Sequence, residues 1–174
     1  MNGSEPRADL VVPRGIVFRR PVEADHAAVI ARMDGWWPGR RARSFVERWW
    51  FRHATGSSWV AEGEDGRLVG FALAQASGDD PAVALVHAIA VDPNRRRRGI
   101  ARALVEHVSD DLRAHGGHRL EAISWPGDPI TTHFLRGIGF VPDDGPGTMR
   151  LFGTPAYPDY EGEGEDRARW TKDL

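Results

Sequence analysis

The chain has 174 residues, of which 41% are hydrophobic and 28% charged, a composition that is ordinary for a soluble globular protein of one domain. It contains no cysteine, which excludes a disulfide framework, a thiol nucleophile and a cysteine-ligated metal. The formal net charge is −2, which argues against a general nucleic-acid-binding protein.

The N-terminal stretch, residues 1–14, is polar and lacks the apolar core of a signal peptide, so we expect a flexible leader there. No apolar run of the sequence is long enough to span a bilayer, so we expect no membrane association and a cytoplasmic protein. The rest of the chain, residues 15–174, is expected to fold as a single domain.

The first structural elements are a strand and two helices. Residues 16–20 read as a strand, and residues 23–33 read as a helix because their apolar side chains recur at helical spacing. The Trp-Trp-Pro-Gly sequence of residues 36–39 ends this helix. A second helix is predicted for residues 44–52, because Ser44 is followed three residues later by a glutamate, which is a capping-box pattern.

Three strands are predicted next. Residues 58–61 and 68–76 form two of them, and the Glu-Asp-Gly sequence of residues 64–66 between them is a hairpin-turn signal. Residues 82–91 are almost all apolar, which suits a central strand buried on both faces.

The second half of the chain alternates helices and strands. An amphipathic helix is predicted for residues 101–115, a strand for 120–125 and a short helix for 130–138, with Asp128 as the N-cap of that short helix. Gly139-Phe140 returns the chain to a strand. The two remaining segments are a long surface loop over residues 143–164 and a last strand over residues 167–172.

Four arginines at residues 95–98 stand between the apolar strand and the amphipathic helix. A helix N-terminus presents free N–H groups and the positive end of the helix dipole, so it attracts anions, and arginines add bidentate phosphate donors. Gly99 would let the backbone approach a ligand closely, because a Cβ there would intrude. Neither the P-loop nor the dinucleotide glycine pattern occurs. We expect a phosphate-bearing ligand; a plain basic surface loop is the alternative.

This stretch resembles the signature of the GNAT acyltransferase superfamily, Arg/Gln-x-x-Gly-x-Gly/Ala, with Arg96, Gly99 and Ala101 at the matching positions. The Ala-Val-Asp-Pro sequence of residues 90–93 and the pair Gly139-Phe140 look like two further features of that superfamily, and the order of elements is similar over nearly the whole chain. Three stretches look like one bacterial branch, most of whose members are uncharacterised: residues 36–40, 136–140 and 159–167.

The resemblance implies an α/β GNAT fold, with a mixed central sheet of about six to seven strands flanked by about four helices. Residues 15–174 would then be a single N-acetyltransferase domain. The implied co-substrate is acetyl-CoA, with no metal, and the implied reaction moves an acetyl group to a primary amine of a small molecule or peptide by direct attack. Homodimers are common in the superfamily, so a monomer and a homodimer both stay open.

The resemblance also assigns cofactor contacts. The pyrophosphate would lie on the N–H groups of residues 97–101, and the pantetheine arm would pair with Ile89 and Val91 like an added strand. The N–H of Ile89 would face the thioester oxygen and stabilise the oxyanion. The complete set of implied cofactor-binding residues is Ile89, Ala90, Val91, Arg96, Arg97, Arg98, Gly99, Ile100, Ala101, Arg102, Asp128, Thr132, Phe134 and Arg136.

His87 is the candidate general base. It is the only titratable side chain within the apolar run of residues 82–91. In the arylalkylamine N-acetyltransferases of this superfamily a histidine acts as base nine residues before the first signature position, and His87 stands nine residues before Arg96. A histidine side chain titrates near neutrality, which suits the deprotonation of an amine. The alternative is a structural histidine that is hydrogen-bonded within the core.

Two positions depart from the pattern. Many members carry a tyrosine that protonates the departing thiolate four residues before the glycine of Gly139-Phe140, and Leu135 stands there. The nearby His133 is expected to point elsewhere on its helix, so water is another candidate acid. Asp128 replaces a common asparagine. A catalytically degenerate member of the fold, which binds CoA or a protein partner, is therefore the alternative function.

The acceptor pocket is expected to include Trp36 and Trp37, because the first helices border that pocket in this fold. Trp49 and Trp50 lie in the same region, where they either contact the acceptor or straddle core and surface. The acidic stretch of residues 159–166 either attracts a cationic amine or is a solvated turn. The sequence leaves the identity of the acceptor open.

Overall fold

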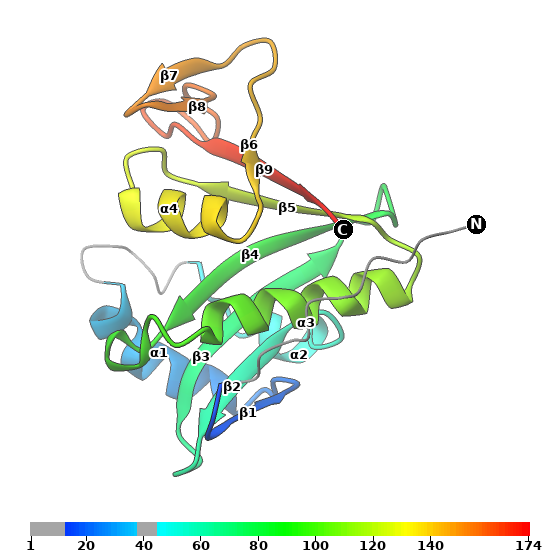
Figure 1. Cartoon of the computed structure of the whole chain (residues 1–174), viewed down its shortest axis with the longest axis vertical. Helices are drawn as coiled ribbons and strands as arrows, with labels where there is room; N and C mark the ends of the chain where they lie inside the picture. Colours follow the sequence, from blue (N-terminus) through cyan, green and yellow to red (C-terminus); the bar gives the residue numbers. More distant parts are fainter. Residues whose placement is uncertain (1–12, 38–44) are drawn as a thin grey trace.

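The computed structural model describes residues 13–37 and 45–174. A seven-stranded sheet in the order β1-β2-β3-β4-β5-β9-β6 forms the centre, with helices on both of its faces and a separate β7–β8 hairpin (Figure 1). The strands are β1 (Ile16–Arg19), β2 (Trp59–Gly63), β3 (Leu68–Ala76), β4 (Val83–Val91), β5 (Arg119–Ser124), β6 (Val141–Pro142), β7 (Met149–Leu151), β8 (Thr154–Ala156) and β9 (Ala168–Asp173). The α-helices are α1 (Asp25–Trp36), α2 (Trp50–His53), α3 (Ile100–Ala114) and α4 (Pro129–Gly137).

The predicted α/β architecture with mixed strand pairing is confirmed. Strands β1 to β4 pair antiparallel in chain order, β4 and β5 are parallel, and β9 joins β5 and β6 antiparallel. The parallel pair needs a crossover connection, and α3 provides it. A short 3-10 turn, Pro93–Arg95, leads from β4 toward this helix. Among the described strands of the sheet, β4 and β5 are thus the one neighbouring pair that runs parallel.

Two apolar clusters lie on opposite faces of the sheet. The α3 side contains the predicted apolar stripe of that helix, which is buried as expected: Leu104, Val105, Val108 and Leu112. The other side is closed by α1 and α2, whose buried members include Val29, Met33 and Phe51. The sheet is thus sandwiched near its middle, where β3 and β4 lie.

The prediction that residues 82–91 are buried on both faces is wrong in part. Ala84, Val86, Ala88 and Ala90 are buried, but the alternate residues from Val83 to Ile89 are only half-buried. Helices α1 and α2 are short, so they cover only part of their face of the sheet. The middle of the central strand is therefore only partly covered.

The predicted helix over residues 44–52 is also wrong in extent. Only Trp50–His53 is helical, and residues 45–49 form turns; the proposed cap, Ser44, lies outside the described residues. In a longer helix the carbonyls of Phe45 and Val46 would accept from backbone N–H groups four residues later. Instead the side-chain Nε2 of His87 hydrogen-bonds the Phe45 carbonyl and that of His26 the Val46 carbonyl. Tertiary hydrogen bonds therefore replace the helical ones.

The segment predicted as a long surface loop, residues 143–164, contains the β7–β8 hairpin. Its two-residue turn is Phe152-Gly153, and both residues have positive φ, +50° and +79°. Such a turn usually carries Asn-Gly or Asp-Gly, so the Phe-Gly pair gave no recognisable signal. The acidic stretch that follows is tied to Arg167, which pairs with Glu161 and Glu165.

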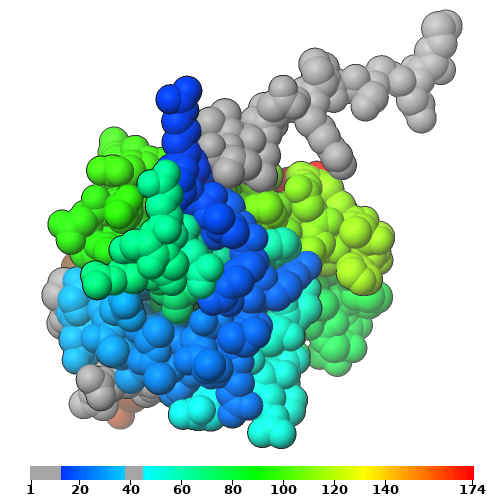
Figure 2. All heavy atoms as spheres, turned by 90° about the horizontal axis from the view of Figure 1, so that it is seen from below, coloured from blue at the N-terminus to red at the C-terminus, as the bar shows by residue number. Residues whose placement is uncertain are grey.

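The chain that enters β1 lies beside the turn that precedes α3. Seen from below, residues 13–15, the β2–β3 hairpin and the β4–α3 turn form one continuous surface (Figure 2). Pro13 is buried, and its carbonyl accepts a hydrogen bond from the Ile16 N–H. Residues 1–12 of the expected leader and residues 38–40 of the Trp-Trp-Pro-Gly-Arg stretch lie outside the described residues.

Candidate active site

A β-bulge on β4 falls at His87. Leu73 of β3 pairs with Ala88, but the next residue, Ala74, pairs with Val86, so His87 is the extra residue that has no partner. Before the bulge the buried side chain of Val86 faces the α3 cluster, and after it that of Ala88 faces the α1–α2 cluster. One inserted residue shifts the alternation of side chains between the two faces of a strand. Beyond the bulge, each side chain of β4 therefore faces the side opposite to the one it would face in a regular strand.

Strands β4 and β5 separate at the same level. Their parallel ladder runs from Val83–Arg119 to Val86–Ala122 and then ends, so the last residues of β4 have no partner in β5. The Asp92 N–H bonds the Val69 carbonyl of β3, so the N–H groups of Ile89 and Val91 point the opposite way. They face the gap that the diverging strands open. A bound extended chain could therefore pair with the free edge of β4.

The β4–α3 turn continues this edge and presents backbone donors. Gly99, the residue before α3, has φ +83° and offers no side-chain cap, and Arg97 also has positive φ, +63°. No acceptor among the described residues hydrogen-bonds the N–H groups of Arg97, Arg98 or Gly99. The first N–H groups of any helix also lack intrahelical partners. The turn thus carries a run of free donors at the positive end of α3, an arrangement that suits an anion, and phosphate binding there stays a prediction.

Glycine is needed at position 99 because of its backbone conformation and not because of crowding within the protein. A Cβ built there meets nothing nearer than the Pro13 side chain, at 3.8 Å. The expected intrusion of a Cβ therefore concerns only an approaching ligand. The positive φ is what an L-residue with a side chain adopts at a cost.

The Arg96 side chain holds the turn to α1. Its Nε donates to the Val91 carbonyl at 3.1 Å, and Nη2 donates to the Trp36 carbonyl at 2.7 Å. Two main-chain groups, one at the end of β4 and one at the end of α1, are thereby fixed to the same guanidinium. This arrangement positions the turn, and a direct role of the Arg96 side chain in phosphate binding stays a prediction.

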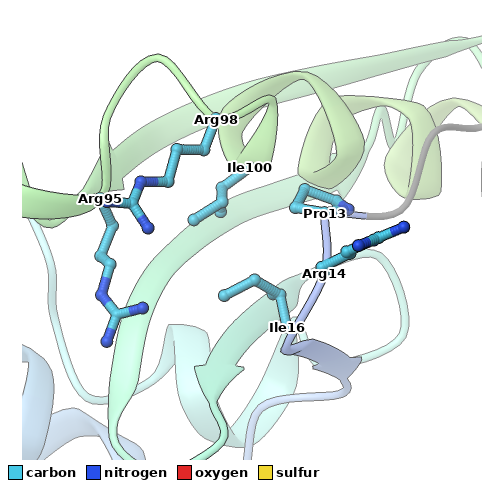
Figure 3. A pocket seen from close by; sticks show the side chains of 6 residues that line it. All are labelled: Pro13, Arg14, Ile16, Arg95, Arg98 and Ile100. Atoms are coloured by element: carbon cyan, nitrogen blue, oxygen red, sulfur yellow. The ribbon is translucent and has the colours of Figure 1, made fainter.

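Arg95 and Arg98 line a cavity of about 220 Å³ between the β4–α3 turn and the chain that enters β1 (Figure 3). Its other walls are Pro13, Arg14, Ile16 and Ile100. Strand β1 is the edge of the sheet farthest from β5, so this cavity lies on the side of α3 away from the β4–β5 gap. The Arg98 side chain, predicted to contact the ligand, is directed to this second side.

Helix α4 follows β5 in the chain. Asp128 caps it as predicted, accepting from the N–H groups of Ile130 and Thr131. The Thr132 hydroxyl is buried and has no hydrogen-bond partner among the described residues. Such an orphaned group is costly unless a ligand or water satisfies it. This observation fits the predicted contact of Thr132 with a bound arm.

The remaining predicted contacts have structural partners. Arg102 donates to the Gly137 carbonyl at 2.8 Å and so links α3 to α4. Arg136 lies 5.5 Å from the ring centroid of the buried Trp170. Phe134 and Ala101 are partly buried against the α3-side cluster, and Ile100 lies within it. Ala90 is buried on the α1–α2 side. Contact of these six positions with a ligand stays a prediction.

His87 is held by a carbonyl and a ring. Its Nε2 lies 2.7 Å from the carbonyl oxygen of Phe45, and its ring stacks on Trp50 with centroids 4.4 Å apart and planes 17° apart. Trp49 stacks on the other face of Trp50 at 4.2 Å. His87 is only half-buried, so these contacts are compatible both with a structural histidine and with a general base.

The tryptophans near the expected acceptor pocket differ in exposure. Trp36 is 4% exposed and stacks on Phe71, so the structure places it in the core, while Trp37 is half-buried. Trp50 is 5% exposed and Trp49 is 39% exposed, so this pair does straddle core and surface. Trp49 and Trp50 therefore lead from the surface to His87. A role of Trp36 and Trp37 in acceptor binding stays a prediction.

Sequence reasoning missed the Phe45 carbonyl and the stack of Trp50 on His87. A main-chain carbonyl carries no sequence signal, and Trp50 lies thirty-seven residues from His87 along the chain. At the tyrosine position of the resemblance, Leu135 is buried in the α3-side cluster, and His133 is exposed. Within residues 13–37 and 45–174, no cluster of His, Asp and Glu is suited to a metal, and no helix is long and apolar enough to cross a membrane.

Comparisons with known proteins identify the family of the chain. A sequence profile described as the acetyltransferase (GNAT) family matches residues 26–140. The chain belongs to the GNAT acetyltransferase family. The matched segment runs from α1 through the bulge, the diverging strands and the β4–α3 turn to the end of α4, so it includes every candidate residue discussed above.

Individual relatives of this GNAT protein are more distant. It is 34% identical over 88 residues to the L-2,4-diaminobutyric acid acetyltransferase of Nocardia farcinica, a match that covers 51% of this chain and 45% of the relative, less than half of its length. A GNAT-family structure from Desulfovibrio desulfuricans superposes with a TM-score of 0.73 at 20% identity, covering 91% of this chain and 98% of that one. The diaminobutyrate acetyltransferase of Paenibacillus lautus, solved with its substrate and coenzyme A, gives 0.64 at 24% identity, covering 89% and 93%.

Proposed function

We propose that this GNAT protein is an acetyl-CoA-dependent N-acetyltransferase that acts on a primary amine of a small molecule or peptide. One observation carries the proposal: the free edge of β4, with the N–H groups of Ile89 and Val91 in the β4–β5 gap, joins the donor-rich turn before α3 at one end and His87 at the other. The Nocardia relative and the Paenibacillus structure, whose names specify diaminobutyrate as acceptor, support an amine substrate.

Residues of β4, of the β4–α3 turn and of α4 fit acetyl-CoA. The N–H groups of residues 97–101 would bind the pyrophosphate, the Ile89 and Val91 amides would pair with the pantetheine arm, and the orphaned Thr132 hydroxyl would gain a partner. Each charge-assisted hydrogen bond contributes about 1.5–3 kcal/mol, so a few of them offset the entropy cost of ordering a flexible ligand. Bound in this way, acetyl-CoA supplies the activated acetyl group.

Acyl transfer by direct attack needs a donor that stabilises the oxyanion and a base that accepts the proton of the amine. The Ile89 N–H, fixed in the strand and without a partner in β5, would donate to the carbonyl oxygen as it becomes an oxyanion. His87, two residues earlier and displaced by the bulge, would take the proton that the amine loses when its nitrogen bonds to the acyl carbon. Placing donor and base two residues apart on one strand fixes their separation, which is the condition for preorganised catalysis.

The leaving thiolate has no assigned acid in this chain. The superfamily tyrosine position carries Leu135, which is 4% exposed and packs in the core. A thiolate is a good leaving group near neutral pH, because a free thiol ionises at only mildly alkaline pH. We therefore assign protonation of the thiolate to solvent and assign no catalytic role to Leu135.

Binding of acetyl-CoA is tested by thermal unfolding. A ligand present at 100 times its Kd stabilises the folded state by about 2.7 kcal/mol, which for a domain of this size raises Tm by several degrees. Millimolar acetyl-CoA should give such a rise, and adenosine alone should not. No rise at millimolar acetyl-CoA would remove the co-substrate from the proposal.

The role of His87 is tested by the pH dependence of kcat/KM in the variant His87→Gln. Glutamine keeps a donor for the Phe45 carbonyl but cannot take a proton, so the fold should survive while the rate falls about a hundredfold or more, the range of general-base catalysis. The acidic limb of the pH–rate profile should also disappear. An unchanged acidic limb would remove His87 from the role of base.

A second candidate function is CoA binding without turnover. The buried Leu135 at the tyrosine position favours it, because the superfamily's acid is missing. The two functions share the thermal response to acetyl-CoA and differ in thiol release with an amine panel. Stabilisation without thiol release from any amine would select the second candidate.

A further inference from the structure

The two ring nitrogens of His87 have different surroundings. Nε2 lies 2.7 Å from the Phe45 carbonyl oxygen, and a carbonyl can only accept, so Nε2 carries the hydrogen in the neutral ring. Nδ1 has no hydrogen-bond partner among the described residues. Among the described residues that are not exposed, only His107 and Thr132 have a side-chain polar atom that is both shielded from solvent and without a hydrogen-bond partner. Because His87 is not one of them, its unpartnered Nδ1 is accessible to solvent.

The plane of the His87 ring is fixed by a column of three stacked rings. Trp50 lies parallel to it, with an interplanar angle of 17°, and is itself buried. Trp49 covers the other face of Trp50, and its indole N–H donates to Glu47 at 2.6 Å. Turning the His87 ring over would break the bond to Phe45, and tilting it would break the stack on Trp50.

We propose that the Phe45 carbonyl and the Trp50 ring are positioning groups that hold neutral His87 as the Nε2–H tautomer and make Nδ1 the atom that receives the substrate proton. The proposal rests on the proposed function of His87 as base. The amine nitrogen bonds to the acyl carbon, the carbon–sulfur bond breaks with its electron pair on sulfur, and the amine proton passes to Nδ1. The imidazolium that forms keeps its Nε2–H bond to Phe45 and places its charge over the face of Trp50, a favourable cation–π contact.

The tautomer can be measured without any assay of activity. Long-range ¹H–¹⁵N correlation spectra of the protein labelled with ¹⁵N-histidine, recorded at mildly alkaline pH, distinguish a protonated from a bare ring nitrogen. The His87→Gln variant identifies the His87 signals by their loss. We expect a protonated Nε2 and a bare Nδ1. A proton on Nδ1, or an even mixture of the two tautomers, would overturn the proposal even if the enzyme is active.

The positioning role of Trp50 is tested by Trp50→Leu and Trp50→Phe, with Phe51→Leu as the control. Phe51 lies on the same short helix and is equally buried, but its ring contacts His26 instead of His87. Trp50→Leu should lower kcat about tenfold, leave the KM for acetyl-CoA within a factor of about two, and give a mixture of His87 tautomers. Trp50→Phe keeps a stacking ring and should restore most of kcat.

The control separates positioning from general loss of core packing. Phe51→Leu should lower Tm as much as Trp50→Leu while it retains kcat and the Nε2–H tautomer. An equal fall of kcat in both leucine variants would overturn the role of Trp50, as would a single unchanged tautomer in Trp50→Leu. If the wild-type protein transfers no acetyl group, the proposed function fails, and the spectra still decide whether Phe45 and Trp50 fix the tautomer.

Discussion

Replacing Gly99 by alanine tests whether the left-handed backbone before α3 is required for phosphate binding. Gly99 has φ +83°, a region where a residue with a Cβ is destabilised by roughly 1–2 kcal/mol. The added Cβ would lie no nearer than 3.8 Å to the Pro13 side chain, so backbone strain accounts for the whole cost. The turn can relieve this strain by leaving the left-handed region, which moves the N–H groups of Arg98 and Gly99.

The expected loss of affinity follows from the number of donors displaced. Loss of one charge-assisted hydrogen bond costs about 1.5–3 kcal/mol, which corresponds to a rise in the Kd for coenzyme A of about tenfold to a hundredfold. Isothermal titration calorimetry measures this directly. The stability of the variant, measured by urea unfolding, should fall by the strain energy alone.

Gly116→Ala is the matched control. Gly116 lies two residues beyond the end of α3 with φ +82°, and a Cβ there would meet nothing within 4 Å, so the two substitutions impose similar backbone strain at opposite ends of one helix. Both variants should lose similar stability, and only Gly99→Ala should lose affinity for coenzyme A. Equal Kd values for Gly99→Ala, Gly116→Ala and the wild type would refute the assignment of the phosphate site.

Two further predictions concern stability and pH. Burial lowers the pKa of His107, which stacks on Trp59, so below pH 6.5 the unfolded chain binds a proton more readily than the folded protein and the free energy of unfolding falls. The variant His107→Phe should reduce this fall in urea unfolding at mildly acidic pH, and an identical dependence of the unfolding free energy on pH in both proteins would contradict the prediction. Burial raises the pKa of Asp25, but hydrogen bonds from Arg19 and the Val22 N–H outweigh it and lower the pKa below its usual 3.8. Asp25→Asn should therefore lower the free energy of unfolding by about 1–3 kcal/mol at neutral pH. This difference should disappear in strong acid, where the wild-type carboxylate becomes protonated in the folded protein.

The parts of the fold that follow from local patterns were predictable. The apolar stripe of α3, the Asp128 cap of α4 and the strand–turn–strand of β2 and β3 each carry a periodicity or turn signal, and each forms where expected. The helix over residues 44–52 failed because the carbonyls of Phe45 and Val46 hydrogen-bond distant histidines, and such contacts leave no trace in local sequence.

The site shows the same division between local and long-range signals. Gly99 and the position of His87 in an apolar strand were visible in the sequence, since each depends on neighbours within a few residues. The bulge, the separation of β4 from β5 and the stack on Trp50 arise from pairing between strands and packing of α2, so sequence could not show them. The use of Arg96 to hold the Trp36 carbonyl is a further contact of this long-range kind.

Acetyl transfer itself is the most direct measurement of the proposed function. The chain has no cysteine, so free thiol that appears in the reaction is coenzyme A alone. With acetyl-CoA and a panel of diamines, amino acids and peptide N-termini, we expect one equivalent of thiol for each equivalent of acetylated amine found by mass spectrometry, and strongly reduced yields of both with His87→Gln. Stabilisation by acetyl-CoA with no acetylated product from any amine above the uncatalysed rate would contradict an N-acetyltransferase.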